Sequence, residues 1–292
     1  MKFIGKTLNY IINTNEELGM FTEKIICDIL KLKFNSKRKY MDADNYPFKL
    51  RQDLEMSLGS YLKSLRIKEH LGHQNTFVDF MTYNKKSISI KTNISGNKIC
   101  PQTIGQVSLE KLNEKTEFKF NSVADYKKNI LKNPNKIVGT YVKHLFCCDQ
   151  MLSFKYDEAK MYSFERTGEI TLQNSKFRFS KTLQTWQNSG SMSMSIEIGG
   201  EFRPLCEFQV HTSRNCIKCR FNLDTVISLI EHGIIENVTM KELGLKHKYQ
   251  IRVVRDDVPV IATKPKAVPI VKKRKIRHDD NDDDEFVVKR RR

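Results

Sequence analysis

The segment from Phe77 to Asn93 places the strongest constraint on the fold, because its pattern is that of a β-hairpin with one apolar and one polar face. An apolar run that contains Asp79 is followed by a turn at residues 83–86 and then by an alternating strand. The polar positions of that strand are Ser87, Ser89, Lys91 and Asn93, and the others are Ile88, Ile90 and Thr92. Since side chains alternate between the faces of a strand, Asp79 and Lys91 are predicted to share one face of the hairpin.

Periodic apolar spacing predicts three helices around this hairpin, at residues 15–32, 53–71 and 104–111. Asn15 is placed to cap the first helix, and Gly72 is placed to end the second. The polar and basic segment between these two helices predicts a loop.

The C-terminal half is predicted to be mostly sheet, because short β-prone runs alternate there with turn residues. These runs are residues 138–146, 152–156, 160–164, 169–172, 176–179, 191–198, 205–211 and 216–221. A last helix follows, capped by Asn222 or Asp224 and ended near Gly233. The sequence therefore predicts a single mixed α/β domain over residues 1–254, in which helices flank a central sheet.

Residues 255–292 lose hydrophobic periodicity and combine prolines with charge blocks, which predicts a disordered tail. Its basic segments, 272–277 and 289–292, have the texture of nuclear-import signals and could equally contact phosphates. If they direct import into a nucleus, the chain belongs to a eukaryote or to a virus that infects one.

A chain of 292 residues with 39% hydrophobic residues can bury a large core without disulfide support. Its seven cysteines are odd in number and irregularly spaced, and no apolar leader is present, which favours free thiols in a reducing, intracellular compartment. No apolar run approaches the ~18 residues of a membrane span, so we expect a soluble protein with no membrane partner.

Basic residues outnumber acidic ones by 51 to 34, which gives a net charge of +17. Eleven basic and six acidic residues lie between Lys264 and Arg292, a net +5, so the rest of the chain keeps +12. A folded body of that charge attracts polyanions over long range, and double-stranded DNA is the partner that we expect.

The hairpin and its surroundings, about residues 50–110, resemble the catalytic layout of the type II restriction endonucleases. That layout is an Asp followed by Asp/Glu-x-Lys, and here Asp79 is followed by Ser89-Ile90-Lys91. Ser89 stands where the family most often has an acid, so another side chain is expected to complete the site. The flanking candidates are Glu55, Gln102 and Gln106.

The resemblance implies a restriction-endonuclease-like fold and Mg²⁺-dependent hydrolysis of double-stranded DNA at a short sequence. Such enzymes are commonly homodimers, whose two-fold axis matches a palindromic duplex. Asp79 would be one oxygen ligand of Mg²⁺ and Glu55 a second, and Lys91 would orient the attacking water or stabilise the transition state. The implied catalytic set is Asp79, Lys91, Glu55, Ser89 and Gln106.

Each of these residues has a structural alternative. Asp79 and Lys91 could form only a cross-strand ion pair, Glu55 could interact only with the helix dipole, and the glutamines could lie on the surface. Two other functions compete with the restriction enzyme: a non-catalytic DNA-binding regulator, and a repair nuclease or resolvase.

A second segment, within residues 160–221, is predicted to read DNA. Arginine pairs with guanine and Asn or Gln with adenine in the major groove, while Lys and Arg also contact phosphates. The candidates are Gln209, His211, Arg214, Asn215, Lys218 and Arg220. An ordinary polar sheet face is the alternative, and Glu207 with Gln209 is a rival catalytic pair.

Two remaining features carry less weight. Cys216 and Cys219 lack a second pair at metal-ligand spacing and are separated by β-prone residues, so we expect their spacing to be incidental. Trp186 lies in a turn-like stretch and could either anchor the core or contact DNA.

Overall fold

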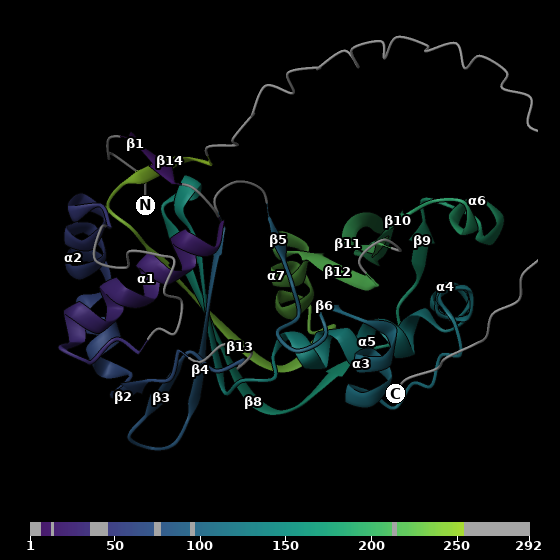
Figure 1. Cartoon of the computed structure of the whole chain (residues 1–292), viewed down its shortest axis with the longest axis horizontal. Coiled ribbons are helices and arrows are strands. Elements are labelled where there is room, and N and C mark those ends of the chain that lie inside the picture. The colour runs from purple at the N-terminus through teal and green to yellow at the C-terminus, as the bar shows by residue number, and fades with distance from the viewer. Residues whose placement is uncertain are drawn as a thin grey trace, which may run out of the picture. The chain divides into compact units, whose positions relative to one another are not determined.

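The computed structural model describes residues 7–12, 15–35, 46–72, 77–93, 97–211 and 215–253 (Figure 1). The chain divides into two units, Met1–Arg255 and Asp256–Arg292. The second unit lies outside the described residues, and so do the expected disorder and basic blocks of the tail. Within the described ranges, no helix is long and apolar enough to cross a membrane.

The first sheet carries the predicted hairpin and has the strand order β13-β8-β7-β4-β3-β2. Its strands are β2 (Ile67–His70), β3 (Phe80–Thr82), β4 (Ser87–Asn93), β7 (Gln150–Lys155), β8 (Lys160–Leu172) and β13 (Ile235–Gly244). Neighbours are antiparallel except β4 and β7, which are parallel. The predicted hairpin is confirmed, because β3 and β4 pair through Phe80 with Ile88 and Met81 with Ser87.

The second sheet is antiparallel, with the order β5-β12-β11-β10-β9 and with β6 also paired to β12. Its strands are β5 (Lys98–Ile99), β6 (Gln106–Val107), β9 (Phe177–Phe179), β10 (Ser191–Ile198), β11 (Glu201–His211) and β12 (Cys216–Asn222). A separate parallel pair joins β1 (Thr7–Ile12) to β14 (Lys248–Val253).

Seven α-helices and one short 3-10 helix lie within the described ranges. They are α1 (Asn15–Leu30), α2 (Phe48–Ser64), α3 (Leu109–Lys115), α4 (Val123–Lys132), α5 (Pro134–Leu145), η1 (Tyr156–Glu158), α6 (Leu183–Gln187) and α7 (Leu223–Glu231). Four helices have a side-chain N-cap, in which an oxygen accepts a hydrogen bond from a backbone N–H of the first turn. The capping residues of α3, α4, α6 and α7 are, in this order, Ser108, Ser122, Thr182 and Asn222.

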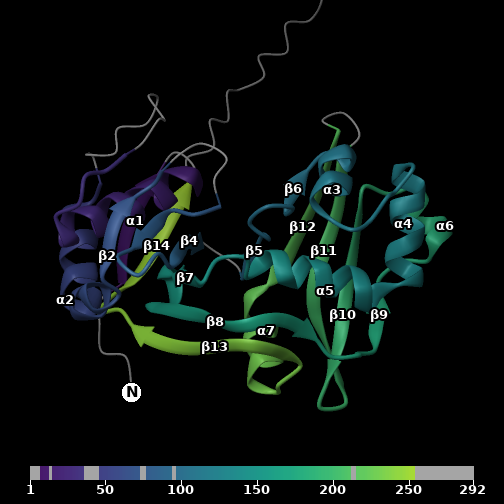
Figure 2. The same cartoon turned by 90° about the horizontal axis from the view of Figure 1, so that it is seen from below.

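The first sheet separates two hydrophobic cores. Ile88 and Leu152 on one face belong to the core that contains the buried side of α1 and α2, and Figure 2 shows these two helices side by side. Met151 and Phe164 on the other face belong to the core that contains α5 and the apolar face of the second sheet. Because both faces are packed, a polar side chain on β4 is retained only where it has a partner or a function.

The mixed α/β class and the sheet-rich C-terminal half are confirmed. The helix expected at residues 15–32 is α1, and the last helix is α7, which Asn222 caps through Thr225 N. Trp186 is fully buried in α6 and packs in the second core, so it is a core anchor.

Three predicted elements were wrong. The β-prone run 138–146 is helical in α5, since Pro134 begins that helix and its Ile, Val and Tyr residues pack on the core. The helix expected at 53–71 ends at Ser64, because Arg66 adopts φ 52° and the chain turns into β2. The helix expected at 104–111 begins only at Leu109, where Ser108 caps α3, and Gln106 lies in β6.

Asp53 fastens α2 to the segment that leads into β14. Its carboxylate is 1% exposed and accepts from Lys246 N at 2.9 Å, His247 N at 3.0 Å and Tyr249 Oη at 2.5 Å. Substitution of Asp53 by alanine is expected to lower the free energy of unfolding by about 3 kcal/mol, because buried donors lose their acceptor. Glu55→Ala, at an exposed position of the same helix, should change it by less than about 0.5 kcal/mol in the same urea titration. Equal effects of the two substitutions would contradict this role.

Candidate active site

Asp79 is held at the start of β3 by both its backbone and its side chain. Its N–H donates to Ile88 O at 2.9 Å and its carbonyl accepts from Leu71 N at 2.8 Å. Its carboxylate Oδ2 accepts from Ile90 N at 2.6 Å and from Ser89 Oγ at 3.2 Å. The carboxyl group is therefore fixed against the middle of β4.

The surroundings of Asp79 disfavour its charge. Burial raises the pKa of Asp79 to about 7, the negative charge of Glu23 adds to the rise, and Lys91 and the two hydrogen bonds from β4 oppose it. The predicted pairing of Asp79 and Lys91 on one face is thus found as an electrostatic interaction. Within the described residues, Lys91 Nζ makes no hydrogen bond or ion pair. A carboxyl group with a raised pKa, beside a lysine that makes no ion pair, is typical of a functional site.

Glu23, on α1, is the carboxylate that sequence reasoning missed. Its signal is helical spacing: Glu23 lies three residues after Met20 and four before Cys27, which are both buried. That spacing places Glu23 on the side of α1 that faces the protein. The carboxylate whose charge acts on Asp79 is therefore Glu23.

His70 fixes the orientation of Glu23. His70 is 1% exposed, its ring stacks on Phe34, and its Nδ1 accepts from Asn35 N at 3.0 Å. Because Nδ1 is the acceptor, Nε2 carries the proton of the neutral ring and donates to Glu23 Oε2 at 3.0 Å. The hydrogen bonds of His70 to Asn35 and Glu23 thus hold the Glu23 carboxylate in one orientation.

The other predicted catalytic residues are not all brought to this place. Ser89 is buried and donates to Asp79. Glu55 is exposed on α2, where it lines a surface pocket with Gln52 and Met56. Gln106 is exposed in β6 and pairs with Lys218 of the second sheet.

Within the described ranges, no group of three or more His, Cys, Asp or Glu residues could hold a metal ion. Asp79 and the neighbouring Glu23, whose charge acts on it, each supply one carboxylate. This set fits Mg²⁺, which is commonly bound through one or two carboxylates together with waters and substrate phosphate.

Four of the predicted recognition residues, Gln209, His211, Lys218 and Arg220, lie on the polar face of β11 and β12. Glu207, Gln209 and His211 alternate along β11, and Lys218 and Arg220 pair opposite Gln209 and Glu207. His211 and Asn215 are exposed, whereas Gln209, Lys218 and Arg220 are partly buried. Arg214 lies outside the described residues.

Glu207 is enclosed by cations. Its Oε2 accepts from Lys98 Nζ at 2.7 Å and Arg220 Nη2 at 2.9 Å, and its Oε1 accepts from Gln209 Nε2 at 2.8 Å. Although partial burial works in the other direction, these partners lower the pKa of Glu207 to about 2. To act as the alternative catalytic pair, Glu207 and Gln209 would have to break these hydrogen bonds.

The Cys100 thiol interacts electrostatically with both the candidate active site and the candidate recognition face. Burial raises the pKa of its thiol, and the positive charges of Lys218, Lys91 and Arg220 oppose that rise. The candidate catalytic lysine and two candidate recognition cations therefore all act on one thiol. Cys216 and Cys219 lie on opposite faces of β12, with Cys219 buried in the core.

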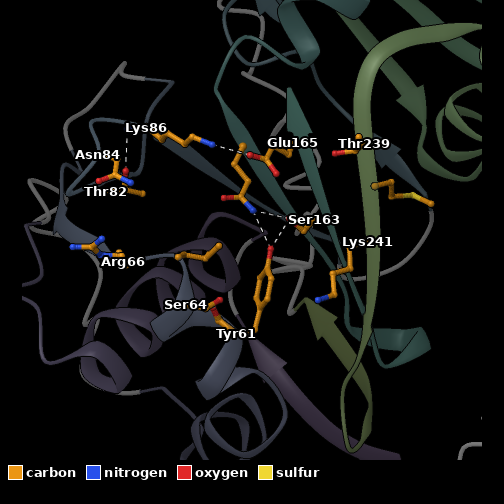
Figure 3. Close-up of a pocket in the computed structure, with 13 residues that line it drawn as sticks. Tyr61, Ser64, Arg66, Thr82, Asn84, Lys86, Ser163, Glu165, Thr239 and Lys241 are labelled. Carbon is orange, nitrogen blue, oxygen red and sulfur yellow. Dashed lines mark hydrogen bonds and ion pairs between the residues drawn. The ribbon is translucent and has the colours of Figure 1, made fainter. Parts of the chain in front are cut away.

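A polar pocket of about 340 Å³ lies apart from these residues (Figure 3). Tyr61 Oη donates to Ser163 Oγ inside it, and Lys86 Nζ pairs with Glu165 at 2.8 Å. In the strand register, Ser163 lies opposite Leu152, and Leu152 lies opposite Ile90. Ser163 therefore lies on the Ile90 face of the first sheet, which is opposite to the face of Lys91. Asp79, Ser89 and Lys91 do not line this pocket.

The chain is similar in sequence to a type II restriction enzyme. The relative is the type II restriction enzyme CviAII of Paramecium bursaria Chlorella virus 1, which is 28% identical over 231 residues. The match covers 73% of this chain and 60% of the relative, so the chain spans less than two thirds of that protein's length. No family model matches the chain, and no solved structure matches it. The similarity supports the expected resemblance at the level of a restriction-enzyme-like protein.

Proposed function

We propose that this protein is a Mg²⁺-dependent endonuclease that hydrolyses phosphodiester bonds of double-stranded DNA at a short sequence. The observation that carries the proposal is the Asp79 carboxyl group, which hydrogen bonds from β4 hold in place, whose pKa burial and Glu23 raise, and on which Lys91 also acts. The similarity to a type II restriction enzyme supports the same activity class.

In this proposal Asp79 and Glu23 would hold the ion. When bound, Mg²⁺ polarises the phosphodiester and lowers the pKa of a coordinated water. Ile90 N and Ser89 Oγ bind one carboxylate oxygen of Asp79 and leave the other free to face a ligand. His70 orients Glu23, and the ammonium of Lys91 orients the attacking water and stabilises the charge that builds on the phosphate.

The polar face of β11 and β12 would read the duplex. Gln209 and Arg220 have the hydrogen-bonding groups for adenine and guanine, although both are held by Glu207 in this structure. Lys218 would contact phosphate, which positions the duplex without specifying its sequence. Cleavage of both strands of a palindromic site would follow from a homodimer.

The proposal is tested by incubating the purified protein with plasmid DNA in Mg²⁺ and, in parallel, in EDTA. Discrete fragments in Mg²⁺ alone are expected. Intact plasmid that still shifts in a gel would support the non-catalytic regulator, and preferential cutting of branched DNA would support the repair nuclease or resolvase.

Two isosteric substitutions distinguish Glu23, the carboxylate that acts on Asp79 in the structure, from Glu55, the second metal ligand expected from the sequence. Glu23→Gln should lower cleavage by about 10²-fold or more, because one of two ion ligands is lost and transition-state charge is less well stabilised. Glu55→Gln, at an exposed position of α2, should leave cleavage unchanged. The measurement is the single-turnover rate at several Mg²⁺ concentrations; a larger loss from Glu55→Gln would restore the original assignment.

A further inference from the structure

Two adjacent thiols lie in the turn between α5 and β7. Cys147 Sγ and Cys148 Sγ both donate to Gln102 Oε1, at 3.2 and 3.0 Å, and Cys148 Sγ also lies 3.2 Å from Phe77 O. Because one oxygen accepts from both thiols, the sulfurs cannot be farther apart than the sum of those two distances.

The thiol pair borders the candidate active site. Phe77 precedes Asp79 by two residues, and the negative charge of Asp79 acts on the Cys148 thiol. The positive charge of Lys91 acts on the Cys147 thiol. Cys147 is partly exposed, so a ligand can reach the pair from its side, while Cys148 is 2% exposed.

A second thiol pair provides a comparison within the same chain. The Cys206 and Cys219 thiols interact electrostatically, but they are 6% and 0% exposed and lie in the core that contains α5 and the second sheet. A reagent cannot reach them without opening that core. Cys147 and Cys148 therefore combine two features that this core pair does not: proximity of two sulfurs and access from outside.

We propose that Cys147 and Cys148 form a dithiol site for thiophilic metal and metalloid ions, and that its occupation blocks the neighbouring Asp79 and Lys91. Two sulfur ligands select soft ions, whereas the carboxylates of Asp79 and Glu23 select hard ones. The chain thus has a soft-ion site beside a hard-ion site. The blocking effect rests on the proposed nuclease function, while the binding does not.

Phenylarsine oxide is the probe, because its trivalent arsenic bonds to two sulfurs at once. Two S–H bonds and the arsenic–oxygen bond break, two As–S bonds form, and the oxygen leaves with both protons as water. No atom changes its oxidation state. A dithiol such as dithiothreitol reverses the reaction by taking over the arsenic.

The full chain is treated with phenylarsine oxide and analysed by intact mass, with Cys147→Ser, Cys148→Ser and Cys216→Ser in parallel. The parent and Cys216→Ser are expected to retain one phenylarsenic group that a monothiol does not remove and dithiothreitol does. Both variants of the pair should fail to retain it. Thermal unfolding of each variant, followed by circular dichroism, shows whether it is folded.

Cleavage of plasmid in Mg²⁺ is measured on the same samples. The arsenical should slow cleavage by at least about tenfold in the parent, which corresponds to about 1.4 kcal/mol of barrier, and should not affect folded Cys147→Ser. Failure of the parent to retain arsenic, or equal retention by both variants of the pair, would overturn the site. Retention without any slowing would overturn the blocking effect. If no sample cleaves DNA, the nuclease proposal fails while the mass result still decides the site.

Discussion

Substitution of Lys91 by alanine is expected to abolish plasmid cleavage while leaving DNA binding intact. Lys91 is the cation whose charge acts on Asp79, and it makes no ion pair within the described residues. Loss of a group that positions a nucleophile or stabilises developing charge costs about 10²- to 10⁴-fold in rate. The measurement is single-turnover cleavage in saturating Mg²⁺, with a gel-shift assay of the same duplex in Ca²⁺.

Lys86→Ala is the matched control for Lys91→Ala. Lys86 belongs to the same hairpin, is exposed in the turn, and pairs with Glu165 on the surface. Its removal deletes the same charge from the same hairpin, so cleavage should change by no more than about twofold, as expected of a surface pair. Equal rates for Lys91→Ala and the parent would remove Lys91 from the mechanism.

The second large effect is expected for Asp79→Asn, which should abolish cleavage and stabilise the fold. An unfolded aspartate has a pKa of about 3.9, whereas burial raises the pKa of Asp79 to about 7 in the folded protein. Between these two values the folded state binds more protons than the unfolded state. Stability therefore falls as pH rises through this window, and the cost is fully present above it.

Asparagine never ionises, so the variant escapes this cost. In EDTA at pH 8, Asp79→Asn should unfold with a free energy at least about 1 kcal/mol higher than the parent, and the difference should shrink toward pH 4. Urea titrations at both pH values measure it. A variant that is inactive and also less stable at pH 8 would indicate that Asp79 has a structural role.

The core of the candidate site could be predicted because its signal is local. Strict alternation in Ser87–Asn93 and a short turn fix which residues of a hairpin share a face, and Asp79, Ser89 and Lys91 are found together as that pattern predicts. The same alternation in β11 and β12 predicted a shared face for Gln209, Lys218 and their neighbours.

The remaining part of the site could not be predicted because it depends on long-range packing. The charge of Glu23 acts on Asp79 because α1 packs against β4 and His70 of β2 orients the Glu23 carboxylate. Helical spacing places Glu23 on the side of α1 that faces the protein, but the neighbouring sequence does not indicate which strand that side packs against. Glu55 is a candidate because it lies on the helix that precedes the Asp79 strand in the resemblance, but its position on α2 is exposed. Similarly, the β-branched residues of α5 give it a local propensity for a strand. It is a helix because Pro134 begins it and its apolar side chains pack in the core.

We propose that Asp79, Glu23 and Lys91 together hydrolyse DNA at a defined sequence. The most direct test of this proposal is sequencing of the fragment ends produced from a plasmid by the purified protein in Mg²⁺, with Asp79→Asn treated identically. We expect all ends to fall at one short recurring sequence and Asp79→Asn to yield none. Intact plasmid in Mg²⁺, or the same ends from Asp79→Asn, would contradict it.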